Sequence, residues 1–257
     1  MPKPIPNKIS LVMVNLHGTL VNTPKIAFES YRQTLSESGI SLTFDEYKQY
    51  IGTSSKTKMA QILADKHIDL NPAEVAALNK RKTVIYDSLL TKDVQIASVI
   101  EALKEFSKAQ IKIVLVSNTS QERIQSVLKD AEISIKFDHI LSDDFKPEAH
   151  TSVYESVASI MAMPLAQCVV IEDSKGIQEA ARAGMYVVGV KSADCPLDLT
   201  GADLVIDHNN TSWFKDFMPK PYNFLQLFTV KNALLAGALI GLGTGLYIGT
   251  RDSRPTP

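Results

Sequence analysis

Residues 9–21 read ISLVMVNLHGTLV, and this stretch decides the fold class. The run from Ile9 to Leu16 is mostly β-branched and aliphatic, which is typical of a strand buried on both faces. His17 and Gly18 interrupt that run and end the strand. The chain therefore begins with a core strand whose carboxyl end carries the polar side chains Asn15 and His17.

A block of predicted helices follows this strand. Between residues 24 and 92, apolar side chains recur at roughly helical spacing, as at Ile26, Tyr31 and Leu35. Pro72 marks the start of a further long helix, because proline is favoured in a first helical turn. We expect this block to form a helical cap inserted after the first strand.

From about residue 97 the pattern changes to helices that alternate with short apolar runs. Such alternation predicts a parallel, doubly wound sheet with its functional site at the carboxyl ends of the strands. The expected architecture is thus α/β, a Rossmann-like core formed by residues 1–23 and 93–207, with a helical cap at 24–92. The further strands are expected at 111–116, 137–141, 168–171, 186–190 and 203–206.

Charge and cysteine content exclude several classes of protein. The 27 Lys and Arg residues nearly balance the 28 Asp and Glu residues, a net charge of −1, so we expect no nucleic-acid partner. Two cysteines, Cys168 and Cys195, are too few for a disulfide scaffold, which favours a reducing compartment.

Four motifs stand at the ends of four expected strands, and their order resembles that of the haloacid dehalogenase-like superfamily. Within it, the chain is similar to the branch of β-phosphoglucomutases and phosphoglycolate phosphatases. The resemblance covers about residues 9–207, and its motifs are Asn15-Leu16-His17-Gly18-Thr19-Leu20-Val21, Val116-Ser117-Asn118-Thr119, Lys146-Pro147 and Val170-Ile171-Glu172-Asp173-Ser174.

The resemblance implies a role for each motif. In the family, an aspartate at the end of the first strand attacks a phosphoryl group, and a second aspartate two residues later is the general acid/base. Acidic residues after the fourth of these strands help to hold Mg²⁺. By resemblance, the phosphate-binding residues would be Thr19, Ser117, Asn118 and Lys146, and the metal side would be Glu172 and Asp173.

The first motif departs from this pattern where the chemistry occurs. Asn15 replaces the nucleophile and His17 the acid/base, and a carboxamide is a poor nucleophile and a weak ligand for a hard cation. We therefore favour a catalytically inactive pseudophosphatase without a required cofactor, although Mg²⁺ could still occupy a weakened site. Two alternatives stay open: an active Mg²⁺-dependent phosphatase with rewired chemistry, and a sensor of small phospho-ligands.

Structural roles compete with these functional ones. Ser117 and Asn118 could cap the helix that follows them, and Asp173 with Ser174 could cap another. Lys146, which precedes a proline, could be an ordinary solvated lysine.

The C-terminal region differs in composition from the rest of the chain. Residues 208–230 interleave aromatic side chains with lysines, a pattern that fits a juxtamembrane linker at a membrane interface. Residues 232–250 carry no charge and would span about 28 Å as a helix, close to the thickness of a bilayer core. We predict a single transmembrane helix at 231–250 followed by a short tail at 251–257.

Glycines recur every fourth residue on this predicted helix. Such spacing places them on one face, where another helix can approach closely. The sequence thus predicts a membrane-anchored accessory subunit whose partners are other transmembrane helices, with the mitochondrion as a candidate compartment. The predicted packing face consists of Gly237, Gly241, Gly245 and Gly249.

Overall fold

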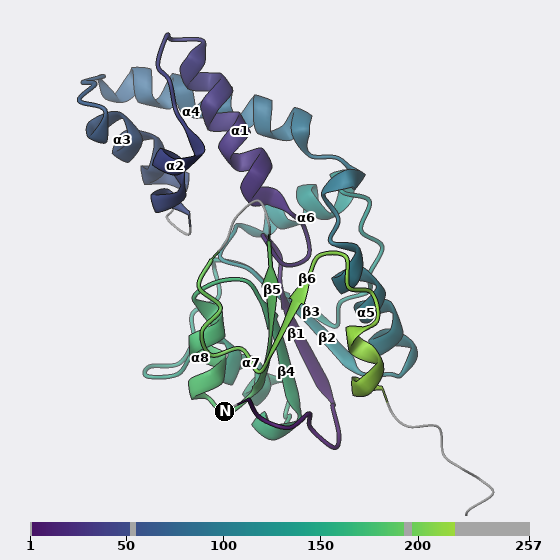
Figure 1. Ribbon diagram of the computed structural model, residues 1–257. Helices are drawn as coiled ribbons and strands as arrows, with labels where there is room; N and C mark the ends of the chain where they lie inside the picture. The colour runs from purple at the N-terminus through teal and green to yellow at the C-terminus, as the bar shows by residue number, and fades with distance from the viewer. Residues whose placement is uncertain (1, 52–54, 193–196, 219–257) are drawn as a thin grey trace, which may run out of the picture. The chain divides into compact units, whose positions relative to one another are not determined.

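Six parallel strands form the central sheet, in the order β3-β2-β1-β4-β5-β6 (Figure 1). This is the strand order of a Rossmann-like fold, in which the direction of strand addition reverses between β1 and β4. The computed structural model describes residues 2–51, 55–192 and 197–218. The strands are β1 (Leu11–Asn15), β2 (Lys112–Val116), β3 (His139–Leu141), β4 (Cys168–Glu172), β5 (Tyr186–Lys191) and β6 (Leu204–Asp207).

The first strand packs against helices on both of its faces. Val12 and Val14 belong to one buried cluster, whereas Leu11 and Met13 belong to another, as the alternation of side chains along a strand requires. The first cluster includes side chains from α5 (Ala97–Lys108) and α6 (Gln121–Asp130), and the second from α7 (Val153–Ile160) and α8 (Gly176–Arg182). Short 3₁₀ turns η2 (Lys92–Val94) and η3 (Leu165–Gln167) precede α5 and β4. The predicted α/β core, a Rossmann-like parallel sheet with helices on its faces, is confirmed.

The helices between β1 and α5 form the cap and have a core of their own. The cap contains α1 (Thr23–Ser36), α2 (Phe44–Tyr47), the 3₁₀ turn η1 (Lys48–Tyr50), α3 (Ser55–Asp65) and α4 (Pro72–Leu89). Tyr31, Leu35, Tyr47 and Met59 are among its buried side chains. At the start of α4, the N-cap Asn71 forms a capping box with Glu74 in the first turn, and Pro72 is the first helical residue, which explains why the helix begins there.

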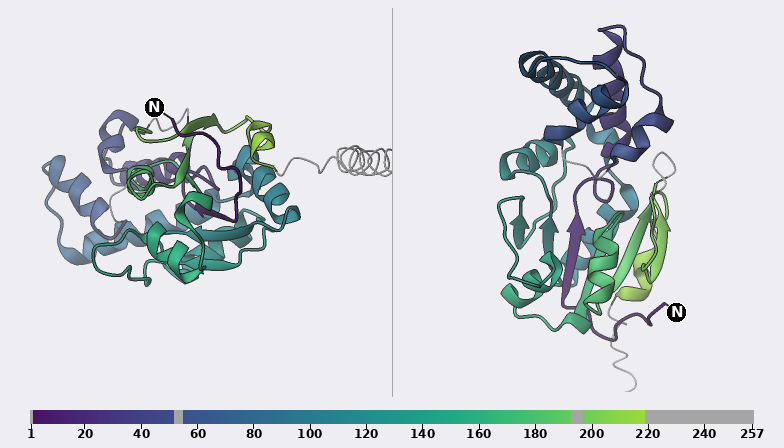
Figure 2. Two further views of the ribbon diagram at one scale, coloured as in Figure 1. Left: turned by 90° about the horizontal axis from the view of Figure 1, so that it is seen from below. Right: turned by 90° about the vertical axis from the view of Figure 1, so that its left-hand side faces the viewer.

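Backbone hydrogen bonds tie the two connections between cap and core to each other. The Asn22 amide donates to the Val94 carbonyl at 2.7 Å, and the Ile96 amide donates to the Leu20 carbonyl at 3.1 Å. Figure 2 shows the cap helices beyond the carboxyl ends of the strands. The cap therefore covers the edge of the sheet where the sequence places the functional residues.

The core extends further along the chain than the sequence predicts. Trp213, Phe214 and Phe217 lie on the 3₁₀ segment η4 (Trp213–Phe217) and pack against Phe106 of α5. The Trp213 indole donates a hydrogen bond to the Ser98 carbonyl at 3.2 Å. The expectation that these three side chains belong to a membrane-interface linker is wrong, because they are buried and pack against α5.

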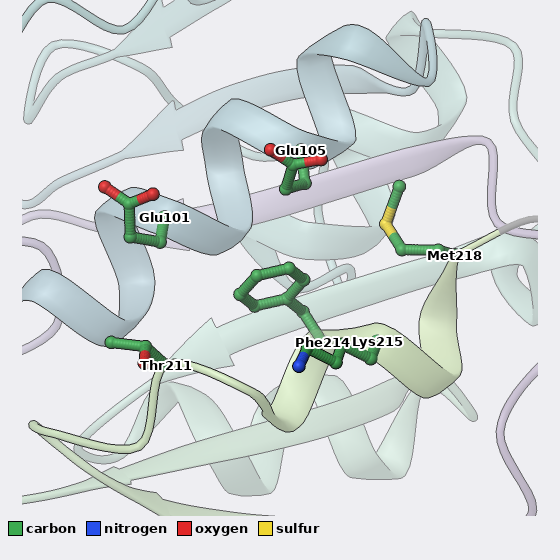
Figure 3. Close-up of a pocket in the computed structure, with 6 residues that line it drawn as sticks. All are labelled: Glu101, Glu105, Thr211, Phe214, Lys215 and Met218. Carbon is green, nitrogen blue, oxygen red and sulfur yellow. The ribbon is translucent and has the colours of Figure 1, made fainter.

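A pocket lies beside this segment, between α5 and η4. Glu101 and Glu105 of α5 line one side of it, and Phe214, Lys215 and Met218 line the other (Figure 3). The first folded unit ends at Met218.

The predicted membrane span is not described by the structure. Among the described residues, no helix has the length and apolar character needed to cross a bilayer. The remainder of the predicted linker (219–230), the span at 231–250 with its four glycines and the tail at 251–257 all lie outside the described residues.

Candidate functional site

The sheet topology brings three of the four motifs to one edge. Asn15 ends β1 and pairs in register with Val116, which directly precedes Ser117. On the other side of β1, Val14 pairs with Ile171, which precedes Glu172 and Asp173. Because parallel strands end at the same edge, these side chains gather there as the sequence predicts.

The Asn15 side chain is held in one orientation by its hydrogen bonds. Its Oδ1 accepts from the Leu16 amide at 2.8 Å, so its Nδ2 must face the other way. Nδ2 donates to the His17 carbonyl at 2.9 Å and to Asp173 Oδ1 at 3.0 Å. Thr19 Oγ1 lies 3.5 Å from Nδ2 and itself donates to Asp173 Oδ1 at 3.2 Å. Asn15 and Thr19 therefore both donate to the same carboxylate oxygen, Oδ1 of Asp173.

Glu172 organises the loop that carries Asp173. It is 5% exposed, and its Oε2 accepts from the Ser174 amide at 2.7 Å and from the Ser174 hydroxyl at 3.1 Å. Its other oxygen accepts from the Tyr154 hydroxyl at 3.2 Å. The expected helix cap at Asp173 and Ser174 is wrong, because the following helix begins only at Gly176 and Lys175 is its N-cap.

The two buried acids interact electrostatically. Burial raises the pKa of Asp173 well above its usual range, and the neighbouring charge of Glu172 raises it further. The hydrogen bonds from Asn15 and Thr19 act in the opposite direction. The donors around Asp173 thus partly compensate a carboxyl group that is costly to ionise.

This arrangement does not fit Mg²⁺. Two oxygens that a hard cation would use, Asp173 Oδ1 and the His17 carbonyl, receive N–H protons from Asn15 instead. In the part of the chain that the structure describes, no group of three or more His, Cys, Asp or Glu side chains could hold a metal ion. The metal role that the resemblance implies for Glu172 and Asp173 has no matching donor set here.

His17 points toward the cap rather than toward Asp173. Its Nδ1 lies 2.9 Å from the Thr23 hydroxyl at the start of α1. Burial lowers the pKa of His17 to about 4, and the nearby Arg123 cation contributes in the same direction. At neutral pH the imidazole is therefore uncharged and has no acidic proton of suitable strength for a leaving group.

The expected phosphate-binding residues do not form one cluster. Thr19 and Ser117 are buried at the edge of the sheet, and the Ser117 hydroxyl has no hydrogen-bond partner in the structure. Asn118 is exposed. Lys146 is also exposed, and its Nζ donates to the Asp143 carbonyl in its own loop at 3.3 Å. The structure thus brings Thr19 near Asn15 and Asp173 but leaves Lys146 bonded elsewhere.

The competing expectation that Ser117 or Asn118 caps a helix is wrong. The N-cap of α6 is Ser120, whose hydroxyl accepts from the Arg123 amide at 3.3 Å. The motifs do not single out Tyr154 of α7, which donates to Glu172, or Arg123 of α6, whose charge acts on His17. No local motif marks them, since only the packing of those helices brings them to the sheet edge.

Comparison with known proteins agrees with the topology and the motifs. Residues 12–190 match the family model described as haloacid dehalogenase-like hydrolase. A β-phosphoglucomutase structure from Clostridium difficile superposes with a TM-score of 0.63 at 24% identity, covering 81% of this chain and 95% of that one. At that identity, the likeness to the solved structure shows the fold.

Two curated relatives extend the comparison to sequence. A phosphoglycolate phosphatase from Caulobacter vibrioides is 24% identical over 76% of this chain and 85% of its own length. Protein SUPPRESSOR OF QUENCHING 1, chloroplastic, from Arabidopsis thaliana is 25% identical over 72% of this chain, and the matched region spans 18% of that relative. This chain belongs to the haloacid dehalogenase-like hydrolase family.

Proposed function

We propose that the chain is a pseudophosphatase: a member of this family whose sheet edge has exchanged covalent catalysis for structure. The observation that carries the proposal is the Asn15 side chain, whose Nδ2 donates to Asp173 Oδ1 at 3.0 Å. Its Oδ1 accepts from a backbone amide, and the lone pair of an amide nitrogen is delocalised. Neither atom of Asn15 is therefore available to attack phosphorus.

The general acid/base is replaced as well. The His17 imidazole bonds to Thr23 and is uncharged at neutral pH. Losing a covalent nucleophile alone lowers turnover by orders of magnitude, and the loss of the acid removes the second contribution. Together the two positions support a function in binding or assembly instead of hydrolysis.

A phosphatase assay tests this proposal. We expect purified full-length protein with Mg²⁺ and p-nitrophenyl phosphate to show no turnover above that of the Asp173→Ala variant. The double variant Asn15→Asp with His17→Asp restores both carboxylates, so measurable hydrolysis by this variant alone would support the proposal. Clear hydrolysis by the wild type that Asp173→Ala or Lys146→Ala abolishes would contradict it and favour the Mg²⁺-dependent phosphatase.

A second candidate function, sensing of a small phospho-ligand, is favoured by one observation. The buried Ser117 hydroxyl lacks a partner, and a hydroxyl of that kind is able to donate to a phosphate oxygen. Titration of inorganic phosphate followed by calorimetry separates the candidates. Saturable binding that Ser117→Ala removes would favour the sensor, whereas no binding leaves the assembly role.

For the C-terminal region we propose a single-pass anchor within a membrane complex. The support is the sequence: the uncharged run from 232 to 250 and its glycines at every fourth position. Deletion of residues 231–257 is expected to move the protein from the membrane fraction to the soluble fraction. Unchanged fractionation would contradict the anchor.

The glycine face makes a separate prediction. Leucine at both Gly241 and Gly245 should keep the protein in the membrane fraction while weakening its co-purification with partner subunits in mild detergent. The matched control is alanine at both Leu242 and Leu246, which directly follow the two glycines and would lie on a neighbouring face of the predicted helix. Equal loss of partners in both double variants would argue against a glycine-specific contact.

A further inference from the structure

Arg123 is one of the core residues that contact the cap. It lies in the first turn of α6, and its Nη1 is 2.6 Å from Asp87 Oδ1 on α4. The centre of the same guanidinium lies 4.8 Å from the centroid of the Tyr86 ring. One core side chain therefore makes both an ion pair and a cation–π contact with consecutive cap residues.

Tyr86, one of the two cap residues that Arg123 contacts, is itself packed against the core. Tyr86 is 8% exposed and belongs to the same buried cluster as Ile124 and Val127 of α6. Burial raises the pKa of Tyr86 to about 12, while the hydrogen-bonding influence of Thr23 and Arg123 lowers it, which places both side chains at the phenol. The last turn of α4 is thus joined to α6 by packing and by polar contacts.

The other connection of the cap, where the chain passes from β1 into α1, is also held by a core side chain. The His17 imidazole bonds to Thr23, the first residue of α1, at 2.9 Å. Because this imidazole is neutral at pH 7, it sits near the Arg123 cation without repelling it. One end of the cap is therefore contacted by His17, through Thr23, and the other end by Arg123, through Tyr86 and Asp87.

Rotation of the cap would have to break these contacts. A hinge motion changes backbone angles in the connecting segments, here 20–23 and 94–96. Those segments are joined by the hydrogen bonds from Asn22 to Val94 and from Ile96 to Leu20. Because Arg123 of α6 also contacts Tyr86 and Asp87 of α4, the backbone angles of the connecting segments have little freedom to change independently of the core.

We propose that Arg123 is a positioning residue that latches the cap to the core by holding Tyr86 and Asp87. The latch keeps the helical cap in one placement over the carboxyl edge of the sheet. This inference concerns cap motion and does not depend on whether the chain hydrolyses phosphate.

Hydrogen exchange of the full-length chain tests the latch. In Arg123→Ala, we expect the hinge amides of Asn22 and Ile96 to exchange about tenfold faster, the combined effect of one partly buried ion pair and one cation–π contact. The amides of β4 should keep their wild-type rates. The matched control is Arg81→Ala, which removes an equally short ion pair to Glu37 (2.6 Å) that lies within the cap.

A charge reversal separates the latch from loss of packing. Arg123→Asp alone should accelerate exchange at the hinge, and adding Asp87→Arg should restore slow exchange by rebuilding the ion pair. Unchanged hinge amides in Arg123→Ala would overturn the proposal. Equal acceleration throughout β1, β4 and the hinge would also overturn it, because that pattern reports global destabilisation instead of cap release.

Discussion

The carboxyl ends of β1 and β4 lie side by side at the site, and they depart from the family motifs to different extents. The end of β4 keeps both acids of its motif, Glu172 and Asp173, in buried positions. The end of β1 has an amide and an imidazole where the family has two aspartates. The same sheet edge therefore combines a retained half and a replaced half.

The difference shows how a retained acid can acquire a structural role. Asp173 would be an uncompensated buried charge if nothing opposed it, and Asn15 supplies an N–H donor at 3.0 Å. Glu172 meanwhile accepts from the backbone and hydroxyl of Ser174. Neutral donors therefore reach both oxygens of Glu172 and Oδ1 of Asp173, and these contacts hold the loop after β4.

The largest effect on stability is expected from Asn15→Asp, which gives the end of β1 a carboxylate like those at the end of β4. It removes a donor and sets a second carboxylate beside Asp173. We expect the free energy of unfolding to fall by about 3–5 kcal/mol, the usual cost of leaving a buried charge uncompensated. Urea denaturation at pH 7 measures this loss.

Two controls show whether the cause is electrostatic. Adding Asp173→Asn to Asn15→Asp reverses donor and acceptor, and should recover most of the lost stability. Millimolar Mg²⁺ should stabilise the Asn15→Asp variant and leave the wild type unchanged. A wild-type protein stabilised by Mg²⁺ would show that Asn15 has not replaced the cation.

A smaller effect is expected from pH at the replaced half. Unfolded His17 binds a proton near pH 6.5, but folded His17 does so only near pH 4. Stability from this residue is therefore complete above pH 6.5 and falls as the pH drops toward 4, by about 2–3 kcal/mol in total.

The variant His17→Asn isolates that contribution. The raised pKa of Asp173 acts in the opposite direction over acidic pH, so the informative quantity is the difference between wild type and variant. We expect this difference in unfolding free energy to shrink from pH 6.5 to pH 4. Parallel stability curves would mean that His17 titrates normally in the folded protein.

The smallest effect is expected at Ser117, which lies beside β1 on the other flank. Because its buried hydroxyl has no hydrogen-bond partner among the described residues, Ser117→Ala should leave stability unchanged or raise it by up to about 1 kcal/mol. Ser120→Ala should instead cost about 1 kcal/mol, since Ser120 caps α6. Thermal unfolding of the two variants distinguishes them, and a clear loss in Ser117→Ala would reveal an unseen hydrogen bond.

The fold was largely readable from sequence. The apolar run before Asn15, the later strand–helix alternation and the helical block at 24–92 each have a period that burial dictates. The end of the core was not readable, because Trp213, Phe214 and Phe217 fit a membrane interface as well as a protein core. Only their packing on Phe106 decides between the two.

The site divides in the same way. The sequence by itself determined that Asn15 and His17 stand where two aspartates belong, and that Ser117, Glu172 and Asp173 share their edge of the sheet. The tertiary structure decided what those groups do: Nδ2 of Asn15 bonds to Asp173, and His17 turns to Thr23 beside Arg123. The physical reason is that the positions of strands and helices along the chain follow from local periodicity, whereas hydrogen-bond partners depend on side chains that meet only after distant helices have packed.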